Sequence, residues 1–392
     1  MYNEELRPDL PIRWAMVGGG RGSEIGYAHR SAALRDNYFQ LCAGAFDIDP
    51  ERCQSFGKNL GLAENRCYAN YIDMFAQEKQ RNDGIQAVSI ATPNGTHYEI
   101  SKAALEAGLH VICEKPLTFT TEDAKELQQL SKQKKLLLGV TYGYSGYPMI
   151  HQARSMVKNG DLGNVRVVNM QFAHGFHSAA VDGAGAKWRM NPKTSGPSYV
   201  LGDIGTHALY LGELITGLEI EKLLCTRQSF VAERAPLEDN ANVLLKYKGG
   251  AVGNLWASAI NAGSMHQQKI RVVGEKASIE WWDEYPNQLR YEEQGQPVKI
   301  LERGMDYLDT SDSGVDSFRV GGGHAEGFFD AWANIYVRFA RTIESLDSGE
   351  KTDDKNGNVE WYPDAEAGIE GVRFIEKCVA SADNGEIWVD YS

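Results

Sequence analysis

The sequence predicts an α/β protein with two domains, the first at residues 1–145 and the second at residues 146–392. Three observations favour this fold class. Short apolar strands alternate with helices over the first third of the chain, which is typical of a doubly wound parallel sheet. A glycine-rich turn follows the first of these strands. Later strands follow one another closely, which favours a large, mostly antiparallel sheet flanked by helices.

The composition is that of an ordinary globular protein, with 42% hydrophobic and 24% charged residues among 392. A net charge of −13 argues against general binding to nucleic acids or anionic membranes, which needs a basic surface. Residues 1–5 lack the basic start of a signal peptide, and no apolar run of about eighteen residues predicts a membrane span. Six scattered cysteines without CxxC spacing are expected to be reduced, buried thiols of a cytoplasmic protein.

The first strand, residues 12–17, runs into a glycine-rich turn and then a helix at residues 27–34. Glycine at such a turn lets the backbone approach a pyrophosphate, and the following helix presents free N–H groups. Gly18, Gly20 and Gly26 are the candidate cofactor-binding glycines. The spacing departs from the simple dinucleotide pattern, because Ser23 stands where a glycine is expected. We interpret the loop as longer by three residues, which leaves the individual pyrophosphate contacts open.

The second strand, residues 40–46, ends at Asp47. A carboxylate at this position can accept both ribose hydroxyls of NAD and would repel the 2′-phosphate of NADP. Arg52 follows five residues later and would soften that preference. NAD is therefore the expected cofactor, with NADP the weaker alternative.

The third strand, residues 85–90, is followed by Thr92, Asn94 and His97, which we expect at the cofactor together with Glu114. A helix at residues 100–108 leads into a buried strand at residues 111–113. Pro116 cannot continue the hydrogen-bond ladder, so Lys115 lies at the carboxyl end of that strand. Ligands bind at this edge of open α/β sheets. A further strand at residues 136–140 completes the parallel sheet.

The second domain begins with a helix at residues 148–159 and continues with strands separated by turn signals. The predicted strands cover residues 165–172, 221–230, 241–247, 253–260, 269–273, 277–281, 288–292 and 386–390. Helices are expected at residues 208–214, 328–343 and 368–382. One sheet face should carry helices, and the other could pair subunits, which would explain outward apolar residues such as Trp256 and Trp281.

Asp203 and His207 lie four residues apart just before the helix at residues 208–214. If this segment is helical, the two side chains share one face. A carboxylate beside an imidazole can fix its tautomer and stabilise its protonated form. The alternative is an N-cap aspartate and a structural histidine, and the spacing alone favours that alternative slightly.

Other polar groups are weaker candidates. His174 and His177 follow a strand end, but no carboxylate or thiolate has convincing ligand spacing, so no metal is predicted. Trp188 and Arg189 could line a sugar-binding site, and a role in packing or on the surface is an equal alternative. Residues 321–327 form a polar, glycine-rich loop that either closes over substrate or is an ordinary loop. Tyr144, Trp188 and His324 are the predicted substrate-binding residues.

Four segments together resemble the Gfo/Idh/MocA family, named for glucose–fructose oxidoreductase, inositol dehydrogenase and a rhizopine-catabolism protein. They are the turn at residues 18–26, Thr92-Pro93-Asn94 with His97, Glu114-Lys115-Pro116, and the segment at residues 202–207. The resemblance implies an N-terminal Rossmann domain and a C-terminal domain with a large, mostly antiparallel sheet. It also implies that Asp203 and His207 are a catalytic pair, and that the Lys115–Pro116 peptide bond is cis.

The expected activity is reversible hydride transfer between NAD and a secondary alcohol of a cyclic polyol, sugar or glycoside. His207 would take the hydroxyl proton, Asp203 would orient His207, and Lys115 would hydrogen-bond the reacting oxygen. This requires Lys115 and His207 to face one cavity. Two alternatives stay open: a glycosidase that retains NAD and acts by transient oxidation and elimination, or a non-catalytic cofactor-binding regulator. A homodimer or homotetramer is expected.

Overall fold

The computed structural model describes residues 11–180, 188–312, 314–349 and 361–392. The prediction about residues 1–5 lies outside these ranges. Two compact units make up the chain. The first comprises residues 11–143 with Trp332–Ile369, and the second comprises Tyr144–Ala331 with Glu370–Ser392.

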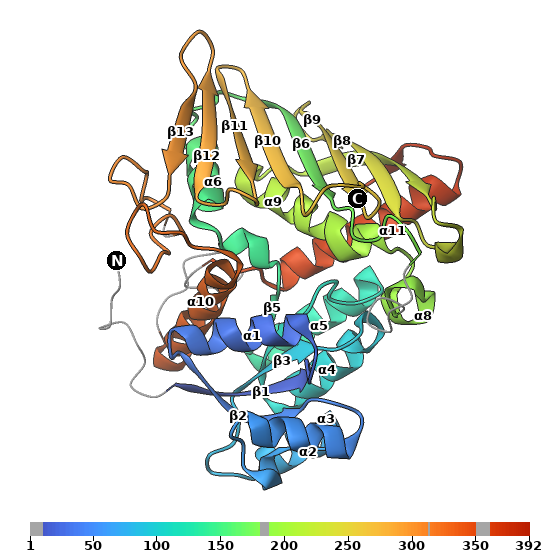
Figure 1. Cartoon of the computed structure of the whole chain (residues 1–392), viewed down its shortest axis with the longest axis vertical. Coiled ribbons are helices and arrows are strands. Elements are labelled where there is room, and N and C mark those ends of the chain that lie inside the picture. The colour runs from blue at the N-terminus through green and yellow to red at the C-terminus, as the bar shows by residue number, and fades with distance from the viewer. Residues whose placement is uncertain (1–10, 181–187, 313, 350–360) are drawn as a thin grey trace. The chain divides into compact units, whose positions relative to one another are not determined.

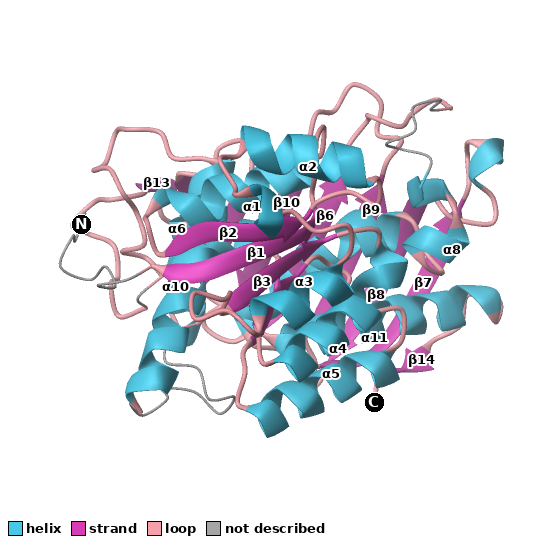
Figure 2. Cartoon of the chain, turned by 90° about the horizontal axis from the view of Figure 1, so that it is seen from below, coloured by secondary structure: helices cyan, strands magenta, loops and turns pink. Residues whose placement is uncertain are grey.

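The first unit contains the predicted parallel sheet, in the strand order β2-β1-β3-β4-β5. Its strands are β1 (Ile12–Gly18), β2 (Phe39–Ala45), β3 (Ala87–Ala91), β4 (His110–Cys113) and β5 (Leu138–Val140). Its helices up to β5 are α1 (Glu24–Arg35), α2 (Pro50–Asn59), α3 (Tyr71–Glu78), α4 (His97–Ala107) and α5 (Thr121–Lys134). Every residue of β3 is buried, as expected for a strand covered on both faces. Figure 2 shows α4 and α5 side by side.

Local sequence signals explain where these helices begin and end. The Ser23 hydroxyl accepts a hydrogen bond from the Gly26 N–H and caps α1. Helix α4 ends at Gly108, which adopts the left-handed conformation with φ of 91°. The chain then turns directly into β4. This places Glu114, Lys115 and Pro116 immediately beyond the carboxyl end of a central strand.

A later part of the chain returns to the parallel sheet. Trp332, Tyr336 and Phe339 are buried residues of α10 (Phe328–Ser348) that belong to the first unit. Beyond α10, the Val140 N–H donates to the Pro363 carbonyl, and Asp364 forms an antiparallel bridge with Gly139. This bridge covers part of the edge strand β5 and satisfies backbone groups that an exposed edge would leave open.

The second unit contains a nine-stranded sheet in the order β13-β12-β11-β10-β6-β9-β8-β7-β14. Its strands are β6 (Val165–Ala173), β7 (Ile220–Gln228), β8 (Asn240–Tyr247), β9 (Val252–Ser258), β10 (Gln268–Gly274), β11 (Ala277–Trp282), β12 (Gln288–Glu293), β13 (Lys299–Glu302) and β14 (Val389–Asp390). The prediction of a mostly antiparallel sheet is confirmed. One pair differs, because β6 and β9 are parallel.

One face of this sheet is covered by helices, as predicted (Figure 1). The helices of the unit are α6 (Pro148–Lys158), α8 (Pro192–Ser195), α9 (Thr206–Thr216) and α11 (Ala365–Asp383), the last of which begins in the first unit. Buried residues of α6, α9 and α11 pack with alternate strand residues in one hydrophobic core. The polar residues of the opposite face include Asn254 and Arg271, which alternate with buried neighbours.

The prediction that Trp281 faces outward is wrong. Trp281 is buried on the helix-covered face, and its ring lies 5.4 Å from that of Tyr147. Side chains alternate along a strand, and Trp281 shares the face of the core residue Ile279. Its neighbour Trp282 lies on the outer face instead, with the Lys269 Nζ atom 3.9 Å from its ring centroid. Trp256 lies on the outer face as predicted, because it follows the buried residue Leu255 in β9 and side chains alternate along a strand.

Candidate active site

The glycine turn after β1 is shaped by close backbone approach. Gly18 has a positive φ of 74°, which favours glycine. A Cβ atom on Gly26 would lie 2.1 Å from the Gly19 carbonyl oxygen, so only glycine allows α1 to approach the turn this closely. A Cβ atom on Gly20 would lie 2.6 Å from the Phe46 carbonyl. The longer loop thus keeps the tight turn and the close helix packing that a dinucleotide pyrophosphate requires.

Asp47 follows β2, as predicted. Its Oδ1 atom accepts a hydrogen bond from the Asp49 N–H at 3.0 Å, and its Oδ2 atom pairs with Arg52 Nη2 at 3.0 Å. Arg52 is largely exposed, whereas the Asp47 carboxylate is mostly covered. The Asp47 carboxylate is therefore partly neutralised by a solvent-exposed guanidinium.

His97 holds the chain segments that follow β3 and β4. The residue is fully buried, and its Nδ1 and Nε2 atoms lie 2.8 and 3.0 Å from the carbonyl oxygens of Pro116 and Thr92. Burial lowers the pKa of His97, although both carbonyls favour ring N–H groups. Asn94 begins the short helix Asn94–Thr96 between them. His97 thus ties two candidate cofactor-binding segments together through their backbones.

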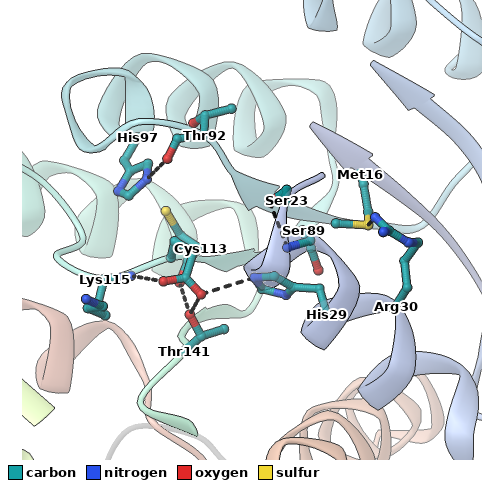
Figure 3. A network of polar contacts seen from close by, with 12 residues as sticks. Met16, Ser23, His29, Arg30, Ser89, Thr92, His97, Cys113, Lys115 and Thr141 are labelled. Carbon is teal, nitrogen blue, oxygen red and sulfur yellow. Dashed lines mark hydrogen bonds and ion pairs between the residues drawn. The ribbon is translucent and has the colours of Figure 1, made fainter. Parts of the chain in front are cut away.

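Glu114 is the centre of a polar network in the first unit, and Figure 3 labels its partners His29, Lys115 and Thr141. Its Oε1 atom accepts hydrogen bonds from Thr141 Oγ1 at 2.5 Å and from His29 Nε2 at 3.2 Å. Its Oε2 atom accepts from the backbone N–H of Lys115 at 3.2 Å. Burial alone would raise the pKa of Glu114, but the hydrogen bond and charge of His29, the charge of Lys115 and the Thr141 hydroxyl together lower it. The buried carboxylate is therefore ionised. The Lys115–Pro116 peptide bond is cis, as predicted.

Asp203 and His207 lie on one continuous helical segment of the second unit. A π-helical turn at Leu201–Gly205 carries Asp203, and His207 is in the first turn of α9. The buried carboxylate of Glu238 holds the start of this segment, because it accepts hydrogen bonds from Ser198 Oγ and the Leu201 N–H. The expected helical placement is confirmed, but as a π turn rather than a regular α-helix. Such turns are frequent at functional sites.

An aromatic cluster surrounds the buried His207 ring. The Tyr144 ring lies 5.0 Å from His207 and perpendicular to it, and Phe172 lies 6.3 Å away. Tyr144 also contacts His266, with 3.1 Å between the phenol oxygen and Nε2. His266 Nδ1 in turn pairs with Asp283. The predicted substrate residue Tyr144 and the predicted base His207 are therefore neighbours.

A second cluster surrounds Asp203. Arg189 Nε lies 3.5 Å from the Asp203 carboxylate, and its guanidinium carbon lies 4.6 Å from the Trp188 ring centroid. Trp188 therefore supports the partner of Asp203. Burial lowers the pKa of His174 to about 4, and burial also lowers the pKa of His177. The negative charge of Asp203 opposes both shifts but does not reverse them, so both imidazoles are neutral near pH 7.

His324 lies in an exposed part of its loop. Its carbonyl oxygen accepts a hydrogen bond from the buried Arg303, and the buried carboxylate of Glu326 accepts from the N–H groups of Arg319 and Val320. These contacts fix the backbone at both ends of the glycine-rich segment. A contact between His324 and substrate stays a prediction. Within the described ranges, no group of three or more His, Cys, Asp or Glu side chains could hold a metal ion.

The structure adds residues that the sequence reasoning missed. His29 is a lone histidine among small apolar residues of α1, and Tyr336 lies 307 positions away from it. No local pattern connects such residues. His266 lies in a loop between two strands, where a histidine carries no signal of its own.

Comparison with known proteins agrees with this architecture. Residues 12–142 match the model of an oxidoreductase family's NAD-binding Rossmann fold, and residues 154–391 match that family's C-terminal alpha/beta domain. The chain belongs to the Gfo/Idh/MocA oxidoreductase family. It is thus an oxidoreductase with an NAD-binding Rossmann domain.

Two solved structures and one further relative match the chain over almost its whole length. The structure of an inositol dehydrogenase homolog from Azotobacter vinelandii complexed with NAD+ is 58% identical, with a TM-score of 0.96 and 100% coverage of both chains. The same homolog complexed with NADH and myo-inositol is 58% identical, with a TM-score of 0.92 and 98% coverage of both. The uncharacterized oxidoreductase YfiI of Bacillus subtilis is 55% identical over 100% of both chains.

Two further observations concern the helices and the cysteines. No helix in the described part of the chain is long and apolar enough to cross a membrane. All six cysteines are free and buried, as predicted.

Proposed function

We propose that the protein is an NAD-dependent dehydrogenase acting on a secondary alcohol of a cyclic polyol, with sugars and glycosides as the nearest alternatives. The observation that carries this proposal is the chemistry around Asp203. Neutral imidazoles of His174 and His177 and the nearby aromatic rings provide hydrogen bonds and apolar faces, which suit an uncharged ring rich in hydroxyl groups. Similarity to a homolog whose structure contains myo-inositol supports the same substrate class.

The proposed cofactor site is formed by the glycine turn, Asp47 and the segment after β3. Gly18, Gly20 and Gly26 are proposed to form the tight turn that a pyrophosphate approaches, because a Cβ atom on any of them would clash with neighbouring protein atoms. Asp47 would accept the ribose hydroxyls. Thr92 and Asn94 are proposed to contact the cofactor directly. Glu114 and His97 are proposed to act through the backbone around Lys115, since their polar atoms are already engaged there.

The proposed catalytic residues are Lys115, Asp203 and His207, and we propose that they serve the same substrate hydroxyl. His207 accepts the hydroxyl proton as general base, and Asp203 favours the protonated imidazole that results. Lys115 donates a hydrogen bond to the reacting oxygen and stabilises its developing negative charge. NAD, when bound, supplies the acceptor for the hydride.

A screen for NAD reduction tests this function. Purified protein is mixed with NAD and inositols, aldoses or alkyl glycosides, and NADH is followed by absorbance. We expect NADH formation with at least one cyclic polyol, and loss of about a hundredfold or more in kcat for Lys115→Ala and His207→Ala. Lys102→Ala is the matched control, because Lys102 is a half-exposed lysine of α4 paired with Glu126. It should retain the wild-type rate.

The same screen separates the alternatives. Glycoside cleavage without net NADH would indicate a glycosidase that regenerates its cofactor. Binding of NAD without any product from any compound would indicate a regulator. Either result contradicts the proposed dehydrogenase.

The protein is also proposed to be a cytoplasmic homodimer or homotetramer. Six free thiols suit a reducing compartment. The outer face of the nine-stranded sheet exposes Leu244 and Val252, at 49% and 45% of their surface. Apolar groups on the open face of a sheet favour pairing with a second copy.

A further inference from the structure

A row of buried polar groups connects α10 to Glu114 within the first unit. Tyr336 OH lies 2.7 Å from Ser89 Oγ and 2.5 Å from His29 Nδ1. Ser89 Oγ also accepts a hydrogen bond from Trp14 Nε1 at 2.9 Å. His29, Ser89 and Trp14 are fully buried, and Tyr336 is nearly so. The row begins at Trp14, near the start of β1, and ends at the Glu114 carboxylate.

The direction of the last hydrogen bond in this row is fixed by chemistry. An ionised carboxylate only accepts hydrogen bonds, so the N–H group at His29 Nε2 donates a hydrogen bond to Glu114. The Tyr336 hydroxyl sets the position of the other ring nitrogen, Nδ1. The T-shaped contact of His29 with Trp332, at 5.1 Å between ring centroids, restricts the ring further. His29 is therefore held in one orientation by two residues of α10.

Glu114 links the fixed His29 ring to the backbone of Lys115 through its two carboxylate oxygens. One carboxylate oxygen is held by His29 and Thr141, and the other accepts the Lys115 backbone N–H. On the far side of Lys115, His97 contacts the carbonyl of Pro116. The main chain at Lys115 and Pro116 is thus hydrogen-bonded to the buried side chains of Glu114 and His97, while Lys115 itself is only partly buried.

We propose that His29 and Tyr336 are positioning residues for Lys115 and act through the Glu114 carboxylate. The inference rests on the proposed function in one respect, that Lys115 takes part in catalysis. Catalytic groups must be held close to their productive geometry, and buried hydrogen bonds from a rigid scaffold provide that restraint. Loss of the Tyr336 hydroxyl frees the imidazole, and loss of the imidazole leaves a buried charge with one donor fewer.

A double-mutant cycle tests whether these residues act through Lys115. Tyr336→Phe and His29→Ala are each made in the wild-type protein and in a Lys115→Ala background. We expect about a tenfold fall in kcat in the first background and less than about a twofold fall in the second, because residues that act as a unit are not additive. His29→Gln, which keeps an N–H group, should recover part of the lost rate. Equal falls in both backgrounds would show a general structural role and overturn the proposal.

The matched control is Tyr98→Phe, which removes a phenol hydroxyl from the same unit. That hydroxyl donates to the exposed Glu126 and lies outside the row. Tyr98→Phe should leave kcat unchanged, and every variant should bind NAD with a dissociation constant within about threefold of wild type. A general loss of NAD binding by Tyr336→Phe would also count against a positioning role.

A measurement without substrate separates this inference from the proposed function. Lysines are dimethylated with ¹³C, and the Lys115 signal is assigned by its absence in Lys115→Arg. Tyr336→Phe should move the Lys115 signal, and Tyr98→Phe should not. If the signal moves but no polyol is oxidised, the positioning stands and the proposed function fails. If polyols are oxidised but the signal stays in place and the cycle is additive, the positioning fails alone.

Discussion

At the scale of single residues, we expect the ion pair of Asp47 and Arg52 to determine how strongly the protein prefers NAD to NADP. We expect the wild type to bind NAD more tightly, because a carboxylate repels the 2′-phosphate. Asp47→Asn should lower the ratio of the NADP dissociation constant to the NAD dissociation constant by about tenfold or more. Glu106→Gln, on the exposed side of α4, makes the same change of charge elsewhere and should leave the ratio unchanged. Tighter wild-type binding of NADP than of NAD, measured by calorimetry, would refute this prediction.

His110 gives a second prediction, on the dependence of stability on pH. Burial lowers the pKa of His110 from 6.5 to about 4, and its Nδ1 atom accepts the Leu137 N–H. Between these values the unfolded chain binds the proton more readily than the folded chain. This contribution to stability is therefore complete above about pH 6.5 and is lost as the pH falls toward 4. The melting temperature of the wild type should fall as the pH is lowered. In His110→Asn, whose side chain keeps an acceptor but does not titrate, this fall should be smaller by about 2 °C. Identical acid profiles in calorimetry would contradict it.

At the scale of elements, α1 approaches the glycine turn so closely that no space is left for one added methyl group. Gly26→Ala would place a Cβ atom 2.1 Å from the Gly19 carbonyl, so the helix must move away. We expect NAD affinity to fall by about tenfold or more. Gly22 has a positive φ of 81° but open space around its Cβ position, so Gly22→Ala tests backbone strain alone. A larger loss of affinity for Gly22→Ala than for Gly26→Ala would show that close packing is not the decisive property.

The elements themselves were largely predictable because burial imposes a period on the sequence. The strands β1, β3 and β4 and the helices α6 and α10 lie where apolar spacing places them. Predictions failed where the period carries no information. Alternation cannot fix the outward face of β11 without knowing where the helices lie, and strand spacing cannot show that β6 pairs in parallel with β9.

The candidate site was predictable to a similar extent. Lys115, Asp203 and His207 stand in recognisable segments, whereas His29 and Tyr336 are joined only by the tertiary fold. The π turn was not predictable either, because a turn of 5 residues is too short to show a helical period.

At the scale of the whole molecule, the open face of the nine-stranded sheet predicts the assembly state. We expect a dimer or a dimer of dimers at micromolar concentration in sedimentation experiments. Replacing Leu244 and Val252 together by Asp should shift the protein to a smaller species, because buried unpaired charges oppose association. Ile72→Asp introduces the same charge at an exposed residue of α3 and should not change the mass. A monomeric wild type would contradict the prediction.

Residues of α10 pack on the parallel sheet although they are translated long after it, and this order affects how the first unit folds during synthesis. Domains near the N-terminus generally fold while the ribosome is still adding later residues. Here residues 11–143 emerge without Tyr336, Phe339 and Asp364, which cover Ser89, Gly139 and the β5 edge in the finished protein. All of Tyr144–Ala331 must be translated first. A nascent chain that stops at Gly143 is therefore an unfinished NAD-binding unit, and a chaperone or ribosome-bound factor would meet its uncovered surface until translation has passed Ile369.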